Sequence, residues 1–455
     1  MITANEISLA QHCISHALSC GASAARVYLN KCVTDSYTIL NGGLDKVTHS
    51  ADRSIYLYIF ADNRYGTFST NRLEKNELED FIQRAIEMVR MLGEDECRKL
   101  PSPERTAKDA VTGLELQLYD AAYEQMDADT RLANAFRLSR YDEIKAAEDG
   151  YRLISEECEY SCTSDDSYTA DSQGFEGRHR ETTFGTFSEM TIEDRDGNKY
   201  SGYWWQTSPR MADTDFEECG KKALERAVRQ IGPKKRRSGR YRMVVDTAVS
   251  SRLVSPVITA LNAASVQQKM SFLDGAIGEK VFHEGMTLMD LARTPGKNGS
   301  RLFDTEGVAT KDTSVIENGT VRQYFVNTYQ SGKMGIEPTI EDVSRPCLMP
   351  FIKGKDLESE EKAVSLNDIL KLTGNGILVT GFNGGNCNPV TGDFSFGIEG
   401  FAFSRGRITH PVREMLITGN IVELWNNLTA AGTDARPSSR WQIPSLAFED
   451  VVFSA

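Results

Sequence analysis

The chain of 455 residues contains no stretch of eighteen uncharged apolar residues, so it lacks a segment able to cross a membrane as a helix. Its first residues, MITANEISLAQHC, also lack the basic segment, apolar core and small-residue cleavage site of a secretory signal peptide. We therefore expect a cytoplasmic protein without a membrane partner.

Cysteine pairs and clustered positive charge are missing as well. The nine cysteines are an odd number and include no CxxC pair, unlike a disulfide framework or a zinc ribbon. The net charge is −13, the isoelectric point is near 5.2, and the only four-residue basic run is Lys234–Arg237. Because binding to a phosphate backbone requires clustered Lys and Arg, we expect reduced thiols and no direct nucleic-acid partner.

Familiar hydrolase motifs are not present. No GxSxG sequence follows an expected strand. The pair His283-Glu284 is followed by Thr287 and Leu288 at the positions where a zinc-binding helix would need its second histidine. The sequence therefore predicts no catalytic residue.

Two isolated features could still carry chemistry. His12 and His16 have the i, i+4 spacing of a metal-binding pair, with Cys13 beside them. Since no carboxylate lies nearby in the sequence, a partly buried histidine pair is the simpler interpretation, and we predict no metal site. Cys387 lies in a glycine-rich segment, where we interpret it as a small side chain in a crowded turn rather than as a nucleophile.

The length of the chain and its composition, 40% hydrophobic and 26% charged, are typical of a globular protein with two or three domains. We predict an N-terminal α+β domain at residues 1–235 and a C-terminal, mainly β domain at residues 236–455. In the second domain, a helix is expected from about Ser250 to Gln268, with Pro256 near its beginning. Strands with glycine turns, such as Glu317-Asn318-Gly319-Thr320, are expected after it.

The first domain contains a short repeat. The tetrapeptide Asp35-Ser36-Tyr37-Thr38 returns as Asp166-Ser167-Tyr168-Thr169, and strand-like residues and an amphipathic helix follow each copy. This pattern predicts two similar strand-meander-plus-helix units at about 25–95 and 155–232, with chance similarity as the alternative. The expected fold class is therefore α+β, with one large helix in the mainly β C-terminal domain.

The stretch Gly381–Phe403, GFNGGNCNPVTGDFSFGIEGFAF, is rich in glycine and alternates aromatic residues. Glycines supply positive φ at turns, and residues two apart share one face of a strand, so the stretch predicts a tight hairpin. Its polar side chains are Asn383, Asn386, Asn388, Thr391 and Asp393, which are residue types common in turns.

Several motifs occur in a fixed order in the second half. Residues 272–279 read FLDGAIGE, residues 299–307 read GSRLFDTEG and are completed by Thr310, and Thr418-Gly419-Asn420 comes last. The first two are similar to the F-x-x-G-x-x-G-E and G-S-x-x-x-D-x-E-G-x-x-T elements of the TldD/PmbA family. Together with the glycine-rich hairpin, they make the chain resemble the PmbA (TldE) branch of that family.

The resemblance implies a metallopeptidase family in which TldD carries His-Glu-x-x-x-His on the helix before the F-x-x-G element and a cysteine near its C-terminus. Three protein ligands leave one zinc position open for a water that the glutamate deprotonates. The corresponding residues 253–262 here contain no histidine, glutamate or cysteine, and residues 420–455 contain no cysteine. We therefore expect no cofactor in this chain and a zinc ion in a TldD-type partner.

The resemblance thus implies a non-catalytic PmbA/TldE-like subunit of a TldD/TldE-type complex that cleaves unfolded peptides, with any effect on DNA gyrase indirect. In such a complex we expect five polar side chains of the glycine-rich hairpin to line a peptide-binding cleft, with ordinary turn residues as the alternative: Asn383, Asn386, Asn388, Thr391 and Asp393. The alternative is a regulator that binds peptides or proteins on its own, or as a homodimer, without hydrolysis. A third hypothesis is acid/base chemistry by Asp304, Glu306 and Asp393, although such residues more often cap turns.

Overall fold

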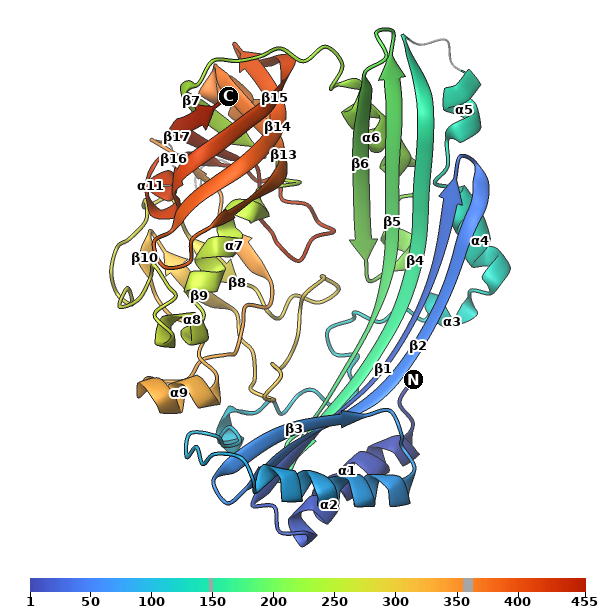
Figure 1. The fold of residues 1–455 in the computed structure, drawn as a ribbon, viewed down its shortest axis with the longest axis vertical. Coiled ribbons are helices and arrows are strands. Elements are labelled where there is room, and N and C mark those ends of the chain that lie inside the picture. The colour runs from blue at the N-terminus through green and yellow to red at the C-terminus, as the bar shows by residue number, and fades with distance from the viewer. Residues whose placement is uncertain (147–149, 355–362) are drawn as a thin grey trace. The chain divides into compact units, whose positions relative to one another are not determined.

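The computed structural model describes residues 1–146, 150–354 and 363–455, which form two compact units (Figure 1). Unit 1 comprises Met1–Val228, Arg293–Lys311 and Asn327–Glu341, and unit 2 comprises Arg229–Ala292, Asp312–Val326 and Asp342–Ala455. The expected boundary after residue 235 lies close to the first passage between the units. The two later segments that return to unit 1 were not expected. Within the described residues, no helix combines the length and apolar composition needed to cross a membrane.

Unit 1 is built on a six-stranded antiparallel sheet of long, curved strands (Figure 1). Its order is β3-β2-β1-β4-β5-β6. The strands are β1 (Ala24–Leu40), β2 (Gly43–Ala61), β3 (Arg64–Thr70), β4 (Tyr151–Asp171), β5 (Glu176–Asp194) and β6 (Lys199–Ser208). The first and last halves of the sheet therefore meet where β1 pairs with β4.

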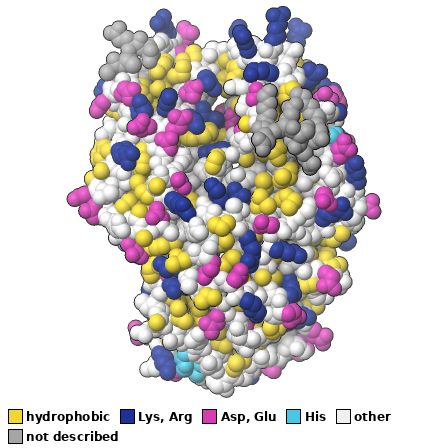
Figure 2. Space-filling view, turned by 180° about the vertical axis from the view of Figure 1, so that it is seen from behind, with side chains coloured by type: hydrophobic (Ala, Val, Ile, Leu, Met, Phe, Trp, Pro, Cys, Tyr) yellow, Lys and Arg dark blue, Asp and Glu magenta, His cyan; other side chains and the backbone are white. Residues whose placement is uncertain are grey.

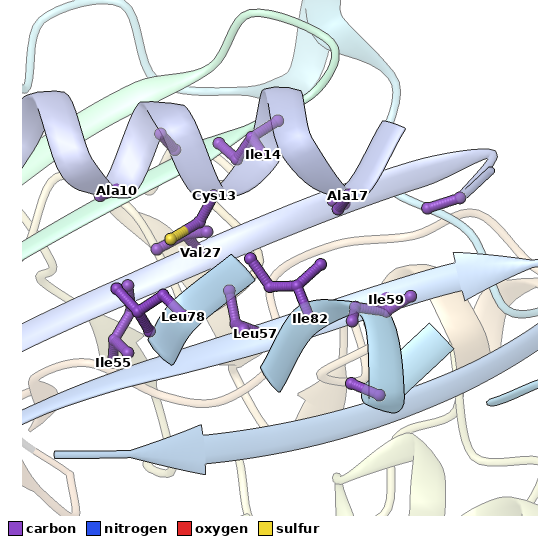
Figure 3. Close-up of a cluster of buried hydrophobic side chains, with 14 of the residues drawn as sticks. Ala10, Cys13, Ile14, Ala17, Val27, Ile55, Leu57, Ile59, Leu78 and Ile82 are labelled. Carbon is purple, nitrogen blue, oxygen red and sulfur yellow. The ribbon is translucent and has the colours of Figure 1, made fainter. Parts of the chain in front are cut away.

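Helices α1 (Ala4–Ser19) and α2 (Lys75–Val89) pack on the half that contains β1 to β3. Both helices turn their apolar residues, which recur at helical spacing, toward the strands. The buried cluster is shown in Figure 3, where Ala10, Cys13, Ile14, Ala17, Val27, Ile55, Leu57, Ile59, Leu78 and Ile82 are labelled. This cluster fixes α1 beside α2.

On the other half, α6 (Glu217–Val228) lies against β5 and β6. Shorter elements complete the unit: α3 (Ala122–Gln125), α4 (Ala128–Phe136), α5 (Tyr141–Ala146), α9 (Thr328–Met334) and 3-10 turns at Pro103–Arg105 and Met211–Asp213. A second buried cluster on this half includes Ala135, Tyr160 and Phe216.

The two halves share one order of elements, and their first two strands pair in one register. Each is a three-stranded meander followed by a helix, β1-β2-β3-α2 and β4-β5-β6-α6. Placing Asp35 on Asp166 also places the pair Asp35↔His49 on the pair Asp166↔Arg180. The prediction of two similar strand-meander-plus-helix units is confirmed at the level of fold.

Unit 2 contains a ring of strands in which each strand pairs with two others of the ring. The ring runs β7-β13-β14-β15-β17 and closes where β17 pairs with β7. Its strands are β7 (Gly239–Val245), β13 (Gly376–Cys387), β14 (Asp393–Ser404), β15 (Arg407–Asn420) and β17 (Leu446–Ser454). Strands β16 (Leu428–Ala431) and β12 (Phe351–Ile352) extend the sheet from β17.

A second, four-stranded sheet has the order β10-β9-β8-β11. Its strands are β8 (Leu288–Asp290), β9 (Thr313–Glu317), β10 (Thr320–Val321) and β11 (Pro346–Leu348). The helices of unit 2 are α7 (Ser251–Ala260), α8 (Ala263–Gln267), α10 (Leu366–Thr373) and α11 (Ile421–Asn426). The predicted α+β class, with a mainly β C-terminal part, is confirmed.

The large helix expected from Ser250 to Gln268 is divided. α7 ends at Ala260, and α8 starts again after Asn262, whose side-chain Oδ1 accepts a hydrogen bond from the N–H of Ala264. An asparagine that caps a new helix interrupts the old one. Pro256, expected near the helix start, lies inside α7.

Candidate functional site

A pocket of about 240 Å³ lies in unit 2, between one face of α7 and the β13–β14 hairpin. Its lining consists of Arg252, Ser255, Pro256, Thr259, Phe272, Gly385, Asn386, Cys387, Pro389 and Phe396. The α7 residues follow an i, i+3, i+4, i+7 pattern, which places them on one side of the helix. Because pockets for whole small-molecule ligands are usually about 300–1,000 Å³, this one suits a side chain better than a cofactor.

The hairpin wall of the pocket is shaped by glycine. Gly384 and Gly385 both have φ +86°, and the register of β13 with β14 shifts between Phe382 and Gly385. A side chain at Gly385 would collide with the main-chain oxygen of Ser395. Only glycine therefore allows the two strands to approach here and to turn this part of the chain toward α7.

Arg252 connects α7 to this wall. Its Nη2 donates a hydrogen bond of 3.1 Å to the main-chain oxygen of Gly385, and its guanidinium lies 5.1 Å from the ring centroid of Phe396. The arginine is exposed, so its remaining N–H groups face solvent at the rim. The pocket thus combines apolar walls at Pro256, Phe272 and Phe396 with a positive charge at its edge.

The pocket also lies beside an open part of a strand. β7 pairs with β13 only through Ile377–Val379, and none of the other described strands pairs with Gly381–Cys387 on that side. Residues 383–386 are exposed. An exposed strand edge offers main-chain donors and acceptors to another extended chain.

Of the five side chains predicted to line a cleft, Asn386 lines this pocket. The other four bond within the hairpin and its neighbours. Asn383 Nδ2 donates to Glu399, Asn388 Oδ1 accepts from the N–H of Val390, and the Thr391 hydroxyl donates to Asp393 at 2.7 Å. Peptide binding by any of the five stays a prediction.

Asp393 is held by its neighbours as a turn carboxylate. Asn420 Nδ2 donates to it at 3.0 Å, and this bond, with that of Thr391, lowers the pKa of Asp393. A carboxylate with a lowered pKa remains ionised and is a poor proton donor at neutral pH. These contacts favour the alternative interpretation, in which Asp393 is a turn residue.

Cys387 lines the same pocket, but its thiol is not activated. Burial raises its pKa, and the negative charge of Asp393 raises it further. Since the thiolate is the nucleophile, a raised pKa leaves Cys387 protonated at neutral pH.

The residues at the pocket do not fit a catalytic zinc ion. Its lining residues with polar side chains are Ser255, Thr259, Asn386, Cys387 and Arg252, of which only Cys387 carries a zinc-binding atom. No histidine or carboxylate is part of this lining. Zinc requires imidazole, thiolate or carboxylate ligands, and a fixed cation beside the site opposes a second one.

The two carboxylates of the motif at residues 299–307, Asp304 and Glu306, accept hydrogen bonds from main-chain N–H groups of unit 1. Asp304 accepts hydrogen bonds from the N–H groups of Glu306, Val308 and Glu341, at 2.9, 3.0 and 3.0 Å. Glu306 accepts two from Thr328. Burial raises the pKa of both carboxyl groups. These contacts explain the motif as a folded turn.

Sequence reasoning missed the part played by α7. Its pocket-lining residues form no recognised motif. Their i, i+3, i+4, i+7 spacing indicates a binding face only once the hairpin is known to lie opposite them. Arg252, a lone basic residue at a helix start, gave no signal.

Comparison with known proteins gives matches along most of the chain. Residues 25–89 match the model of PmbA/TldA metallopeptidase domain 1, residues 117–231 the central domain, and residues 238–455 the C-terminal domain. The metalloprotease PmbA of Escherichia coli O157:H7 is 23% identical over 431 residues, which cover 94% of this chain and 92% of that protein.

Two solved structures have the same fold. A protein of Bacteroides thetaiotaomicron, described as a candidate modulator of DNA gyrase, is 39% identical, with a TM-score of 0.92 and full coverage of both chains. TldE of Thermococcus kodakarensis is 16% identical, with a TM-score of 0.80, and the match covers 98% of this chain and all of that one.

Proposed function

The chain belongs to the TldD/PmbA family of metallopeptidases, and from this premise we propose that it is the non-catalytic, TldE-like subunit of a cytoplasmic TldD/TldE-type complex. The observation that carries the proposal is the donor set of the α7 pocket, which offers one residue type suited to zinc, Cys387, where a catalytic zinc needs three ligands. The metal and the glutamate that activates water then come from the TldD-type partner.

The role proposed for this chain is to hold an unfolded peptide. An extended peptide pairs with the main chain of β13 beyond Val379, where strand pairing with β7 ends. One of its side chains enters the α7 pocket, whose apolar walls favour an apolar residue. Arg252 at the rim favours a nearby negative charge, such as an acidic side chain or a terminal carboxylate.

The test combines the purified chain with a homologue that bears His-Glu-x-x-x-His. We expect the chain alone to leave an unfolded, labelled peptide intact, and the mixture to cleave it in a chelator-sensitive manner. The matched control is a partner in which the motif glutamate is replaced by glutamine, which should associate but not cleave. Chelator-sensitive cleavage by the chain alone would refute the proposal.

A pull-down from native lysate separates this proposal from a stand-alone regulator. The proposed subunit should recover a homologue with the zinc motif. Recovery of peptides or other proteins without such a homologue, together with a stable homodimer, would instead support regulation without hydrolysis.

A further inference from the structure

Three side chains with metal-binding atoms meet in unit 1, where α1 lies beside α2. His12 and His16 come from α1, and Glu79 comes from α2. Their ligand atoms all lie within 4.8 Å of one another. In Figure 2, histidine side chains are visible at the surface of the end of unit 1 that carries these helices.

The geometry of the group follows from the helix and from the core below it. The i, i+4 spacing places the His12 and His16 rings one above the other, with centroids 5.9 Å apart. His12 Nε2 lies 2.7 Å from Glu79 Oε1. Because the cluster of Figure 3 packs Cys13 and Ile14 of α1 with Leu78 and Ile82 of α2, the backbones that carry the three ligands are held together.

This arrangement corrects the reasoning from sequence. The absence of a carboxylate near His12 in the sequence argued against a metal site, but packing of α2 brings Glu79 to the pair from 67 residues away. Cys13, which follows His12 in the sequence, is buried in the apolar cluster and is not one of the group.

We propose that His12, His16 and Glu79 bind a divalent first-row transition metal ion of the zinc class. Two imidazole nitrogens and one carboxylate oxygen suit zinc and its neighbours, whereas Ca²⁺ and Mg²⁺ prefer oxygen ligands alone. Metal–ligand bonds of about 2.0–2.2 Å require the ligand atoms to lie about 3.3 Å apart. Rotation about the side-chain bonds has to move these atoms by roughly 1 Å. All three side chains are partly exposed, so the ion enters from solvent and keeps water in its remaining positions.

Neighbouring groups modulate this site. Lys75 Nζ lies 3.9 Å from Glu79 Oε1, one turn earlier on α2, and its charge opposes a bound cation. The thiol of Cys20 lies 3.4 Å from His16 Nε2 but is not within reach of all three ligands. The ion therefore competes with Lys75 and with the existing hydrogen bond between His12 and Glu79.

The ion acts as a clamp between α1 and α2. It binds the folded arrangement and not the unfolded chain, so it stabilises unit 1 by an amount that grows with the logarithm of its concentration relative to the dissociation constant. This role lies outside the proposed peptide-holding function, whose pocket is in unit 2.

The test is a zinc titration of the chelator-treated full chain with a competing chromophoric chelator, compared with His16→Ala and Glu79→Gln. Wild-type chain should bind one more zinc ion than either variant, and a 100-fold excess over the dissociation constant should raise its Tm by about 5 °C. Lys75→Ala should bind zinc about twofold to tenfold more tightly. Cys20→Ser is the matched control for adventitious thiol binding and should retain the extra ion.

Equal zinc stoichiometry and equal Tm responses in the wild-type chain, His16→Ala and Glu79→Gln would overturn the proposal. His12→Ala provides a second ligand variant if either of these folds poorly. Partner-dependent peptide cleavage should persist in His16→Ala, so failure of the metal site and failure of the proposed peptidase role give different results.

Discussion

Glu306 accepts two hydrogen bonds from Thr328, one from its main-chain N–H and one from its hydroxyl, each of 2.8 Å. The two residues lie in separate segments of the second half of the chain, and both segments belong to unit 1. The pair therefore joins the two returning segments to each other.

The first prediction concerns this pair. Thr328→Val removes the hydroxyl donor and keeps the shape of the side chain, so one charge-assisted bond to a buried carboxylate is lost. We expect a loss of about 2 kcal/mol in the free energy of unfolding. Urea denaturation measures it, and Thr328→Ser, which keeps the hydroxyl, is the control. A loss in Thr328→Ser without a loss in Thr328→Val would contradict the prediction and assign the stability to packing of the methyl group.

The same pair predicts a dependence on pH. Burial raises the pKa of Glu306, and the nearby charge of Asp304 adds to this effect. A carboxyl group whose pKa is raised in the folded state stabilises the fold most at pH values below its unfolded pKa near 4.5. This contribution is lost as pH rises through the pKa of the folded state. Glu306→Gln keeps an acceptor without titrating. Its stability relative to wild type should therefore improve as pH rises above about 4.5, and a flat difference would contradict the expectation.

A third prediction compares the two halves of the sheet in unit 1. Gly66 on β3 and Gly202 on β6 lie where a helix covers the third strand of each meander. A methyl group at Gly202 would collide with main-chain atoms of Ala223 and Ala227 in α6, whereas at Gly66 it would meet side-chain atoms of Phe68 and Val89 at 2.9 Å. Side chains can move aside, but a helix backbone moves only as a unit.

We therefore expect Gly202→Ala to reduce the free energy of unfolding by about 3 kcal/mol and Gly66→Ala by about 1 kcal/mol. Thermal denaturation of both variants shows which of them loses more stability. The reverse order would show that α6 adapts more easily than the side chains around Gly66.

Local patterns predicted the local structure of this chain well. Asn318 and Gly319 form the expected hairpin turn, with φ of 49° and 78°, and the glycine-rich stretch forms the β13–β14 hairpin. Such features depend on the conformations that a few adjacent residues allow. Repetition of a tetrapeptide was likewise enough to indicate two similar meanders.

Contacts between distant residues were not predictable from those patterns. Arg252 reaches Gly385 across 133 residues, and His12 reaches Glu79 across 67. Both pairs form because apolar faces of helices fix where their polar neighbours lie, and a sequence pattern specifies that a face is buried without specifying its partner. The pocket and the histidine group therefore appeared only with the structure.

A fourth prediction concerns acid stability at the start of the chain. The pKa of Glu6 falls to about 2: burial alone would raise it, but hydrogen bonds from Lys31 and Thr3 outweigh that effect. A lowered pKa contributes stability above the unfolded value near 4.5, and this is lost as pH falls toward 2. In Lys31→Met the pKa of Glu6 should rise. The stability deficit of the variant should be largest above pH 4.5 and shrink toward pH 2.

Carboxyl chemical shifts in an NMR titration report the pKa directly. Arg53→Met is the matched control, because Arg53 lies 3.5 Å from the same carboxylate and is half exposed, so its loss should shift the pKa less. Equal shifts in the two variants would assign the effect to net charge rather than to the Lys31 contact.

The last prediction tests how the α7 pocket takes part in peptide holding. Arg252→Ala removes both the bond to Gly385 and the charge at the rim, and should weaken binding of an unfolded acidic peptide to the assembled complex about tenfold. Fluorescence anisotropy measures the affinity. Arg240→Ala is the control, since Arg240 pairs with Asp450 at the surface and does not line the pocket.

Arg252→Lys separates the two contributions of this residue. It keeps the positive charge but loses the planar guanidinium. In the wild-type chain the guanidinium bonds to Gly385 with one N–H group and has other N–H groups for a ligand. If charge at the rim attracts the peptide, Arg252→Lys should bind nearly as well as wild type. If the shape of the hairpin wall matters more, it should bind as weakly as Arg252→Ala. Wild-type affinity in both variants would remove the pocket from the peptide path and leave the open edge of β13 as the only contact proposed for this unit.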